Sequence, residues 1–489
     1  MGNIKATRRS KIILVPYPAQ GHVTPMLKLA SAFLSHGFDP VMIVPEFIHR
    51  RIISSIEISC VSVPDGLQMD APRDFFANEK AIESCLPIHL KGIVHRLDED
   101  GEVACMVVDL LVSSAIEVGH RCGVPVAGFW PAMLATYQLV SAIPDMTRVG
   151  LISDNGNPQV FGPAKFLHNQ PLLSSEKLPW LIGCPSARKA RFKFWTRTME
   201  RSKSLQWLLV NSFLEDSVDD HVKPQNGALL NNHSRNRQPV VFPVGPLRSK
   251  HGTLKNPSFW LEDTSCLQWL DKQNPGSVIY VSFGSWVSPI GEGKMTGLAL
   301  TLEALGRPFM WVLGDGWRKG LPAGYIDRVS KQGKVVSWAP QMEVLQHKAV
   351  GCYLTHCGWN STMEAIQCQK RLLCYPVAGD QFLNCGYIVQ KWRIGVQINE
   401  FGLKDIEEGL KTVMEDNEMG CRLKTLYEKT MGEEASSKTR STLTEFIDDI
   451  QRTDESAIPL ALEILSSLLN ALRFFMTSLI WIIWIGPRF

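Results

Sequence analysis

The sequence predicts an α/β protein with two doubly wound parallel sheets that face each other across a cleft. Short apolar runs alternate with longer amphipathic stretches in the first half, as in repeated strand–helix–strand units. The same alternation starts again near Ser277, after a polar stretch of Gly, Asn, Pro and charged residues. We predict an N-terminal domain over residues 1–247, a linker over 248–265, a C-terminal domain over 266–450 and an atypical apolar tail over 451–489. Ligands of such domains bind at the carboxyl ends of the strands.

In the first half, apolar runs without polar alternation predict strands that are buried on both faces. These strands are expected at Ile12–Val15, Val41–Val44, Cys105–Val108 and Val124–Phe129. A helix is expected over Pro25–Ser35, because proline suits a first helical turn. Residues 151–189 are rich in Pro, Gly and Ser, which indicates irregular structure or loosely packed helices.

The second half shows the same kind of apolar run. Strands are expected there at Val278–Phe283, Phe309–Leu313, Val335–Ser337, Cys352–Thr355 and Leu372–Tyr375. The globular pattern is complete by about Ile450.

Composition excludes several classes of protein. Among 489 residues, 45% are hydrophobic and 20% charged, as in ordinary globular proteins, which excludes a disordered or fibrous chain. The net charge of +3 lacks the basic excess of a nucleic-acid binder. The 12 cysteines contain no C-x-x-C pair, so they read as scattered thiols of a reducing compartment. The N-terminus has no signal-peptide pattern, so we expect a cytoplasmic location. We also expect a monomer.

The first candidate for chemistry is His22, which follows the first strand and Gly21. A glycine at this edge lets the backbone approach a ligand, and a histidine there can take a proton near neutral pH. The alternative is a helix-capping or hydrogen-bonded structural histidine. Asp109, just beyond another buried strand, could hold the second imidazole nitrogen. Its alternative role is to cap the next helix.

The richest segment runs from Trp338 to Gln381. A strand enters the turn 356–359, and a helix start follows at Asn360 and Ser361. Free N–H groups, a positive dipole end and a neighbouring histidine predict an anion site, with diphosphate as its natural ligand. The alternative is a capped helix without a ligand, since Ser361 and Glu364 have capping-box spacing.

Other motifs do not indicate a metal site, a dehydrogenase or a hydrolase. The run Asp98-Glu99-Asp100 holds an Asp-x-Asp pair, but no strand precedes it, so we expect no metal site there. Neither half opens with G-x-G-x-x-G, which speaks against a dehydrogenase. G-x-S-x-G is absent, which speaks against a hydrolase.

Several motifs together resemble the plant UDP-dependent glycosyltransferases, the inverting family 1 enzymes. WAPQ, HCGWNSTMEA and GDQ stand at the spacing of the 44-residue signature box of that family. YPAQGHVTPML, VGPL, CLQWLDKQNPGSVIYVSFGS and GRPFMWVL also match, so the similarity covers about residues 10–450. SFGSWVSPI with RLLCYPVAGDQ is most similar to subgroup 82.

The resemblance implies the GT-B fold, with two Rossmann-like domains, and transfer of glucose from UDP-glucose to a small hydrophobic acceptor. His22 would be the general base and Asp109 its partner. The donor would need no metal and no further cofactor. The implied donor contacts are uracil stacking by Trp338, with Ala339 and Gln341 beside it, the ribose at Glu364, the diphosphate at His356, Asn360 and Ser361 near Ser285, and the sugar at Trp359, Asp380 and Gln381.

The sequence departs from the family pattern at a few positions. Residues 368–371 read Cys-Gln-Lys-Arg where many members have Ala-Gly-Val-Pro, and we expect altered packing there. Tyr375 stands where Trp is frequent. Gly379 stands where Ala is frequent, next to the implied sugar contact, which leaves the donor sugar open.

Alternatives remain at this point. The fold could use galactose, xylose, rhamnose or glucuronate, or serve a non-catalytic UDP-sugar-binding protein. Residues 458–485 are mostly apolar and offer the only segment for membrane association, as in a tethered lipid or sterol glycosyltransferase. The other interpretations of this segment are a non-native extension and a helix packed on the domain. The acceptor pocket is expected in loops such as Asp65–Glu79 and Ile143–Lys189.

Overall fold

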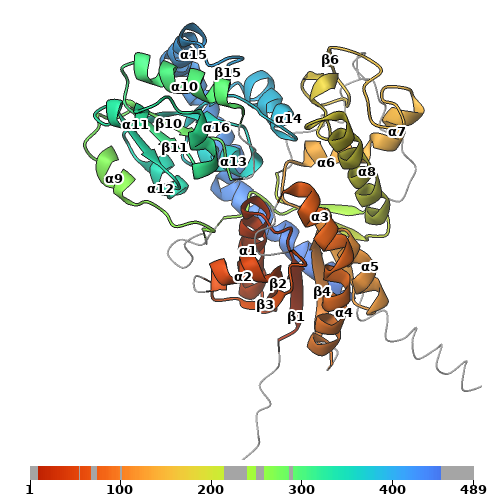
Figure 1. Cartoon of the computed structure of the whole chain (residues 1–489). Coiled ribbons are helices and arrows are strands. Elements are labelled where there is room, and N and C mark those ends of the chain that lie inside the picture. The colour runs from red at the N-terminus through yellow and green to blue at the C-terminus, as the bar shows by residue number, and fades with distance from the viewer. Residues whose placement is uncertain are drawn as a thin grey trace, which may run out of the picture. The chain divides into compact units, whose positions relative to one another are not determined.

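The structure is a computed structural model that describes residues 9–53, 56–67, 74–99, 102–213, 239–248, 258–285 and 290–452. The chain divides into one unit up to Arg440 and a second unit from Ser441 onward, and both large sheets lie in the first (Figure 1).

Seven parallel strands form the first sheet, in the order β3-β2-β1-β4-β5-β8-β9. The strands are β1 (Lys11–Val15), β2 (Asp39–Pro45), β3 (Ser59–Val63), β4 (Val103–Asp109), β5 (Val126–Trp130), β8 (Trp207–Val210) and β9 (Val240–Pro243). The order reverses between β1 and β4. Such a reversal opens a crevice at the carboxyl ends of the two strands, where α/β proteins bind ligands.

Six parallel strands form the second sheet, in the order β12-β11-β10-β13-β14-β15. They are β10 (Val278–Ser282), β11 (Phe309–Val312), β12 (Gly333–Val336), β13 (Val350–Thr355), β14 (Arg371–Cys374) and β15 (Gly395–Gln397). Here the order reverses between β10 and β13. A short antiparallel pair, β6 (Pro163–Ala164) and β7 (Leu173–Ser174), lies outside both sheets.

Helices cover both faces of the second sheet. The α-helices are α1 (Gln20–Ser35), α2 (Glu46–Ile52), α3 (Phe75–Ser84), α4 (Leu86–Leu97), α5 (Ser114–Arg121), α6 (Leu134–Ser141), α7 (Ile143–Arg148), α8 (Pro185–Ser202), α9 (Ser265–Leu270), α10 (Glu292–Ala304), α11 (Tyr325–Arg328), α12 (Gln341–Gln346), α13 (Trp359–Gln367), α14 (Gln381–Gly386), α15 (Leu403–Glu415) and α16 (Asn417–Met431). One apolar cluster joins α10 and α15 to the sheet, and another joins α12, α13 and α16 to its opposite face. Every residue of β10 is buried, as a strand between two helix layers requires.

Shorter helical turns complete the chain. They are the 3₁₀ helices η2 (Leu110–Val112), η3 (Ser175–Lys177) and η4 (Asp315–Gly320), and the π-helix η5 (Tyr387–Lys391).

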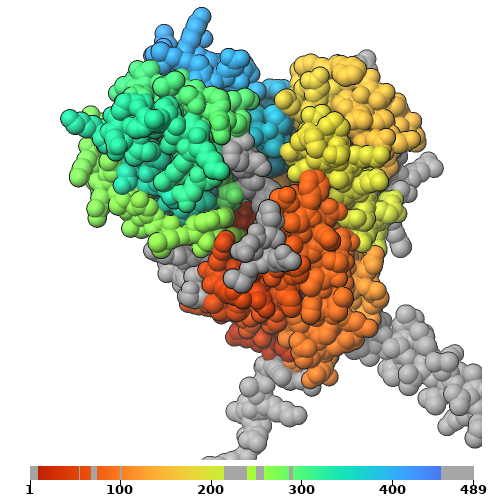
Figure 2. Space-filling model, in the orientation of Figure 1, coloured from red at the N-terminus to blue at the C-terminus, as the bar shows by residue number. Residues whose placement is uncertain are grey.

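Ion pairs join α8 to α3. Arg197 lies 2.7 Å from Glu79, and Arg201 lies 2.7 Å from Glu83. Figure 2 shows the yellow surface of the segment that carries α8 against the orange surface of α3. Residues 151–184 contain little regular structure besides β6, β7 and η3, as their composition predicts.

The two-sheet α/β prediction is confirmed. All nine expected strands are present, with ends within two residues of those predicted. The strands β3, β8, β9 and β15 were not expected; β3 carries two serines and β15 has only three residues, so their apolar signal is weak. The boundaries 1–247, 248–265 and 266–450 stay a prediction.

The start of α1 differs from the prediction. The helix begins at Gln20 and not near Pro25, which lies inside it. Proline lacks an N–H, so Pro25 cannot donate to the carbonyl of Gly21 four residues earlier. That carbonyl is therefore left for another donor.

No helix among the described residues is long and apolar enough to cross a membrane. The segment 458–485 lies outside the described residues, so its expected membrane association stays a prediction.

Candidate active site

His22 and Asp109 meet at the switch point of the first sheet. His22 lies in the first turn of α1, directly after β1, and Asp109 is the last residue of β4. His22 Nδ1 lies 2.7 Å from Asp109 Oδ2. The Asp109 side chain is fully buried, whereas that of His22 is 22% exposed. The pair therefore holds one imidazole nitrogen inside the protein.

Asp109 combines the two roles that its position suggested. Its Oδ1 accepts a hydrogen bond of 2.9 Å from the backbone N–H of Leu111 and so caps η2. Its Oδ2 faces His22. The structural and the chemical interpretation thus apply to different oxygens of one carboxylate.

Tyr17 packs against His22. The two ring centroids lie 5.1 Å apart, and Asn78 of α3 lies close to the Tyr17 hydroxyl. Burial raises the pKa of the Tyr17 phenol well above its ordinary value, so it stays a neutral O–H group. Sequence reasoning missed Tyr17, although it stands in the same segment after β1.

A mostly apolar cavity opens at the carboxyl ends of β1, β2 and β3. It is lined by Val15, Pro16, Pro18, Ile43, Pro45, Phe47, Val63, Pro64, Asp65, Asn78, Ala81, Ile82, Leu86 and Val112. The lining includes Asp65 and Asn78 from the first loop expected at the acceptor pocket, but no residue of Ile143–Lys189. The cavity borders the same strand that leads to His22.

His356 is enclosed at the switch point of the second sheet. It follows β13 and is 7% exposed. A Cβ added to Gly358 or Gly284 would lie 2.4 or 2.7 Å from its Nε2, so both glycines are needed for the ring to fit. Burial lowers the pKa of His356 to about 4, against a weaker opposing effect of the Ser282 backbone. Its buried Nδ1 has no partner among the described residues.

The start of α13 carries no side-chain cap. The helix begins at Trp359 with Gly358 as N-cap, so Ser361 is its third residue and cannot be the cap of a Ser-x-x-Glu box. The capping-box alternative is therefore wrong. A helix start leaves its first N–H groups without helical partners. This start lies beside His356 and the exposed Ser285, which ends the described part of the loop after β10.

Asn360 of α13 forms a hydrogen bond with the first turn of α1. Its Nδ2 donates a 2.7 Å hydrogen bond to the carbonyl of Gly21. This is the carbonyl that Pro25 leaves without a helical N–H. Because Pro25 has no N–H, the Gly21 carbonyl can accept this hydrogen bond from an amide side chain 339 residues away in the sequence.

Gln341 is the centre of a hydrogen-bond network. Its Nε2 donates to Glu364 Oε2 at 2.6 Å and to Ser361 Oγ at 3.1 Å. Its Oε1 accepts from the Tyr280 hydroxyl at 2.9 Å and from that of Tyr353 at 3.4 Å. Gln341 therefore fixes the Glu364 carboxylate and the Ser361 hydroxyl relative to each other.

Trp338 packs against an aromatic neighbour, with an angle of 32° between the two ring planes. It follows β12, and its ring centroid lies 4.4 Å from that of Trp260, with the guanidinium of Arg51 5.6 Å above the Trp260 ring. The N–H of Asp263 donates to the Trp338 carbonyl at 3.0 Å. The adjacent Ala339 is buried. Sequence reasoning placed Trp260 in a linker and gave it no role.

The remaining residues of the box lie at α13 and α14. Trp359 is buried, and its indole N–H donates to the Asn211 carbonyl at 2.6 Å. Burial raises the pKa of Asp380, whose Oδ2 accepts from Asn384 at 2.9 Å. The charge of His22 lowers that pKa, so Asp380 lies within electrostatic reach of the candidate base. Gln381 Oε1 accepts the N–H groups of Val377 and Ala378.

Lys28 is a second residue that sequence reasoning missed. It lies on α1, and burial lowers the pKa of its ammonium group while Glu364 raises it. Conversely, burial raises the pKa of Glu364, and Lys28 and Gln341 lower it. A lysine in a helix without a motif gives no signal in the sequence.

The departures at residues 368–371 concern packing. Gln369 has φ of +51° just after α13, where the family pattern has glycine. Lys370 Nζ donates to the carbonyls of His347 and Val350, and Arg371 donates to those of Val413 and Met414.

Asp98 belongs to the Asp-x-Asp pair at which no metal site was expected. It accepts a hydrogen bond from the N–H of Val103 at 3.0 Å, and Asp100 lies outside the described residues.

Known plant proteins are similar to this chain over most of its length. Residues 262–428 match the family described as UDP-glucoronosyl and UDP-glucosyl transferase. The chain is 54% identical over 449 residues to UDP-glycosyltransferase 82A1 of Arabidopsis thaliana, covering 88% of this chain and 96% of the relative. It is 32% identical over 465 residues to UDP-glycosyltransferase 83A1 of the same plant, with 88% and 95% covered.

Solved plant structures share the fold. Medicago truncatula UGT71G1, complexed with UDP-glucose, aligns with a TM-score of 0.71 at 24% identity, over 90% of this chain and 98% of that one. A UDP-glucosyltransferase from Polygonum tinctorium, complexed with 3,4-dichloroaniline, aligns with a TM-score of 0.73 at 23% identity, over 91% and 99%.

The two Rossmann-like sheets and these structural neighbours define the GT-B fold. The chain belongs to the plant UDP-glycosyltransferases and, among them, to subgroup 82.

Proposed function

We propose that this enzyme transfers glucose from UDP-glucose to a hydroxyl of a small hydrophobic acceptor, with inversion and without a metal ion. The observation that carries the proposal is the 2.7 Å contact between His22 Nδ1 and the buried Asp109 carboxylate. The contact leaves His22 Nε2 for the acceptor hydroxyl. A base held in one tautomer by a buried carboxylate is the arrangement that activates a weak hydroxyl nucleophile.

In the proposed reaction His22 Nε2 takes the proton of the acceptor hydroxyl while its oxygen attacks C1 of the sugar. Asp109 stabilises the imidazolium that forms. UDP leaves from the opposite side, so an α-linked donor gives a β-glycoside. General-base help of this kind contributes about 10²–10⁴-fold in rate.

The leaving diphosphate is proposed to bind at the start of α13, with His356, Asn360, Ser361 and Ser285. The N–H groups and dipole of that helix stabilise the charge that develops. With a pKa of about 4, His356 is neutral at pH 7, and its buried Nδ1 has no partner among the described residues. A phosphate oxygen would give this buried nitrogen the partner it lacks in the protein.

We propose that the rest of the donor contacts residues of the signature box. Trp338 offers a ring to uracil, with Ala339 and Gln341 beside it, and the fixed Glu364 carboxylate offers acceptors to the ribose hydroxyls. Trp359, Asp380 and Gln381 are proposed to face the sugar. Glucose is further supported by relatives named glucosyltransferases, such as the 7-deoxyloganetin glucosyltransferase of Gardenia jasminoides, which is 29% identical over 484 residues.

The apolar cavity beside β1–β3 supports a small hydrophobic acceptor, because its lining offers few polar partners besides Asp65 and Asn78. We also propose that the enzyme is cytoplasmic and monomeric.

The test is turnover with a panel of UDP-sugars and plant aglycones, read by mass and by the anomeric coupling in NMR. We expect a β-glucoside, formed equally well with a metal chelator present. His22→Ala should lose nearly all transfer and keep its UDP affinity. Equal loss of both would make His22 structural, and UDP-sugar binding without turnover on any acceptor would favour a non-catalytic binding protein.

A further inference from the structure

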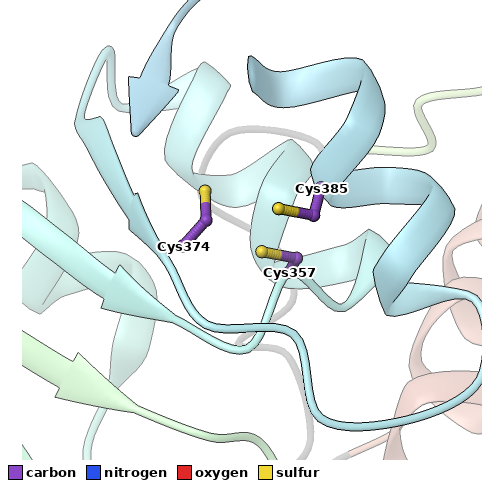
Figure 3. Close-up of side chains that lie close together, drawn as sticks. All are labelled: Cys357, Cys374 and Cys385. Carbon is purple, nitrogen blue, oxygen red and sulfur yellow. The ribbon is translucent and has the colours of Figure 1, made fainter. Parts of the chain in front are cut away.

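Three cysteines that are far apart in the sequence come together in the C-terminal half. Cys357 lies in the turn after β13, Cys374 ends β14 and Cys385 lies in α14. Figure 3 shows their side chains turned toward one another. The three Sγ atoms lie within 4.8 Å of one another, and all three residues are buried. The sequence predicted scattered thiols, because no spacing motif links these positions.

We propose that Cys357, Cys374 and Cys385 form a binding site for a thiophilic divalent cation such as Zn²⁺ or Cd²⁺. Thiolates are the preferred ligands of soft and borderline metal ions. With metal–sulfur bonds of about 2.3 Å, three sulfurs around one ion stand roughly 4 Å apart. The observed spacing therefore needs a contraction of less than about 1 Å.

The neighbourhood of the three sulfurs suits a cation. The three sulfurs form one buried group. A divalent ion that binds all three as thiolates displaces their protons to solvent, and its two positive charges offset most of the thiolate charge inside the protein. Gln397 Oε1, 3.5 Å from Cys385 Sγ, stands beside the site as a neutral oxygen ligand.

The site is coupled to the donor-binding loops through the backbone. Cys357 lies between His356 and Gly358 and has φ of +66°. Asn384 Nδ2 donates to the Cys357 carbonyl at 3.0 Å and to Asp380 Oδ2 at 2.9 Å. Contraction of the sulfurs around an ion would move the turn and α14 together. We therefore expect metal occupancy to inhibit sugar transfer.

The experiment uses the full chain, reduced and then dialysed against CdCl₂. We expect one tightly bound Cd²⁺ per chain, a thiolate-to-cadmium charge-transfer band in the ultraviolet, and transfer activity that falls at least tenfold and returns on chelation. Cys374→Ala and Cys385→Ala should each lose the band and the inhibition. Cys184→Ser and Cys421→Ser, at exposed cysteines, should keep both, as should Cys105→Ala, which removes a buried thiol outside the cluster.

Cooperative thermal unfolding of each variant establishes that it is folded. A charge-transfer band that survives in folded Cys374→Ala and Cys385→Ala, or that disappears in Cys184→Ser, would overturn the proposal. So would the absence of bound Cd²⁺ in the unmodified chain. Cadmium binding is measured without any sugar donor, so its failure is distinct from a failure of the proposed glucosyl transfer.

Discussion

Asp109 divides its two carboxylate oxygens between the fold and the candidate chemistry. Oδ1 caps η2 through Leu111, and Oδ2 holds His22. A substitution that keeps one function and removes the other can therefore separate them. Burial likewise controls the chemistry of His356, because it lowers the pKa of this proposed diphosphate ligand and keeps its ring neutral at pH 7.

Asp109→Asn should separate the two roles. The amide oxygen can still cap η2, but an N–H group placed toward His22 favours the wrong imidazole tautomer. We expect kcat to fall by about 10³–10⁴-fold, with UDP affinity and thermal stability nearly unchanged, as measured by steady-state kinetics, calorimetry and thermal melts. Asp98→Asn, at a carboxylate that also accepts a backbone N–H, is the matched control and should keep full activity. A normal kcat in Asp109→Asn would contradict the assigned role.

His356 should make stability depend on pH. Its pKa falls from an ordinary value near 6.5 to about 4 in the folded protein. Between these values the unfolded chain binds the proton and the folded chain does not, so stability is lost as pH falls from about 6.5 to about 4, by at most about 1.4 kcal/mol per pH unit. Urea unfolding of the wild type and His356→Gln across this range measures the difference. An equal pH slope in the two proteins would refute the prediction.

At the scale of elements, α1 and α13 meet through a backbone carbonyl. Pro25 leaves the Gly21 carbonyl without a helical N–H, and Asn360 supplies the hydrogen bond. At the other end of α13, Gln369 takes a left-handed conformation that costs a side-chain-bearing residue about 1–2 kcal/mol. The start of α13 is thus hydrogen-bonded to α1, and the strained residue Gln369 lies just after the opposite end of the helix.

Pro25→Ala should weaken the contact between α1 and α13. The new N–H competes with Asn360 for the Gly21 carbonyl, and a hydrogen bond of about 1 kcal/mol corresponds to roughly a fivefold loss in kcat/KM. Unfolding should be no easier, because the helix gains a bond. A double-mutant cycle with Asn360→Ala checks the origin of the loss. Fully additive losses would show that the proline does not act through Asn360.

Gln369→Gly should stabilise the protein by about 1 kcal/mol, because glycine adopts positive φ without the steric cost. Gln367→Gly, at the last residue of α13, is the control and should destabilise the protein, because glycine disfavours the helical conformation by up to about 1 kcal/mol. Denaturant midpoints at constant m-value measure both. Destabilisation by both substitutions would mean that the Gln369 side chain contributes more than its backbone costs.

At the scale of the whole molecule, both sheets place their candidate groups at a switch point. His22 and Asp109 flank the reversal between β1 and β4, and residues 284–285 and 356–361 flank that between β10 and β13. Lys28 and Glu364 add an electrostatic link between α1 and α13. Nucleotide binding should therefore depend on a charge from the N-terminal half.

Lys28→Met tests this link. The ammonium group lowers the pKa of Glu364 against the effect of burial, so its removal should raise that pKa. UDP affinity, which is proposed to need the carboxylate, should then begin to fall at a higher pH than in the wild type as the solution is acidified. Calorimetric titration with UDP across acidic pH measures the shift. Lys91→Met, at an exposed lysine of α4, should leave the profile unchanged, and an unchanged profile in Lys28→Met would remove the proposed coupling.

The sequence by itself determined the α/β class, nearly all the central strands and the separate positions of His22, Asp109 and the Trp338–Gln381 box. Apolar runs, glycine turns and motif spacing are local properties that one chain segment carries alone. Only the tertiary structure decided which residues meet: His22 with Asp109, Asn360 with Gly21, Trp338 with Trp260, and the three cysteines. These partners are distant along the chain, and packing of the strands and helices, not spacing, brings their side chains close together.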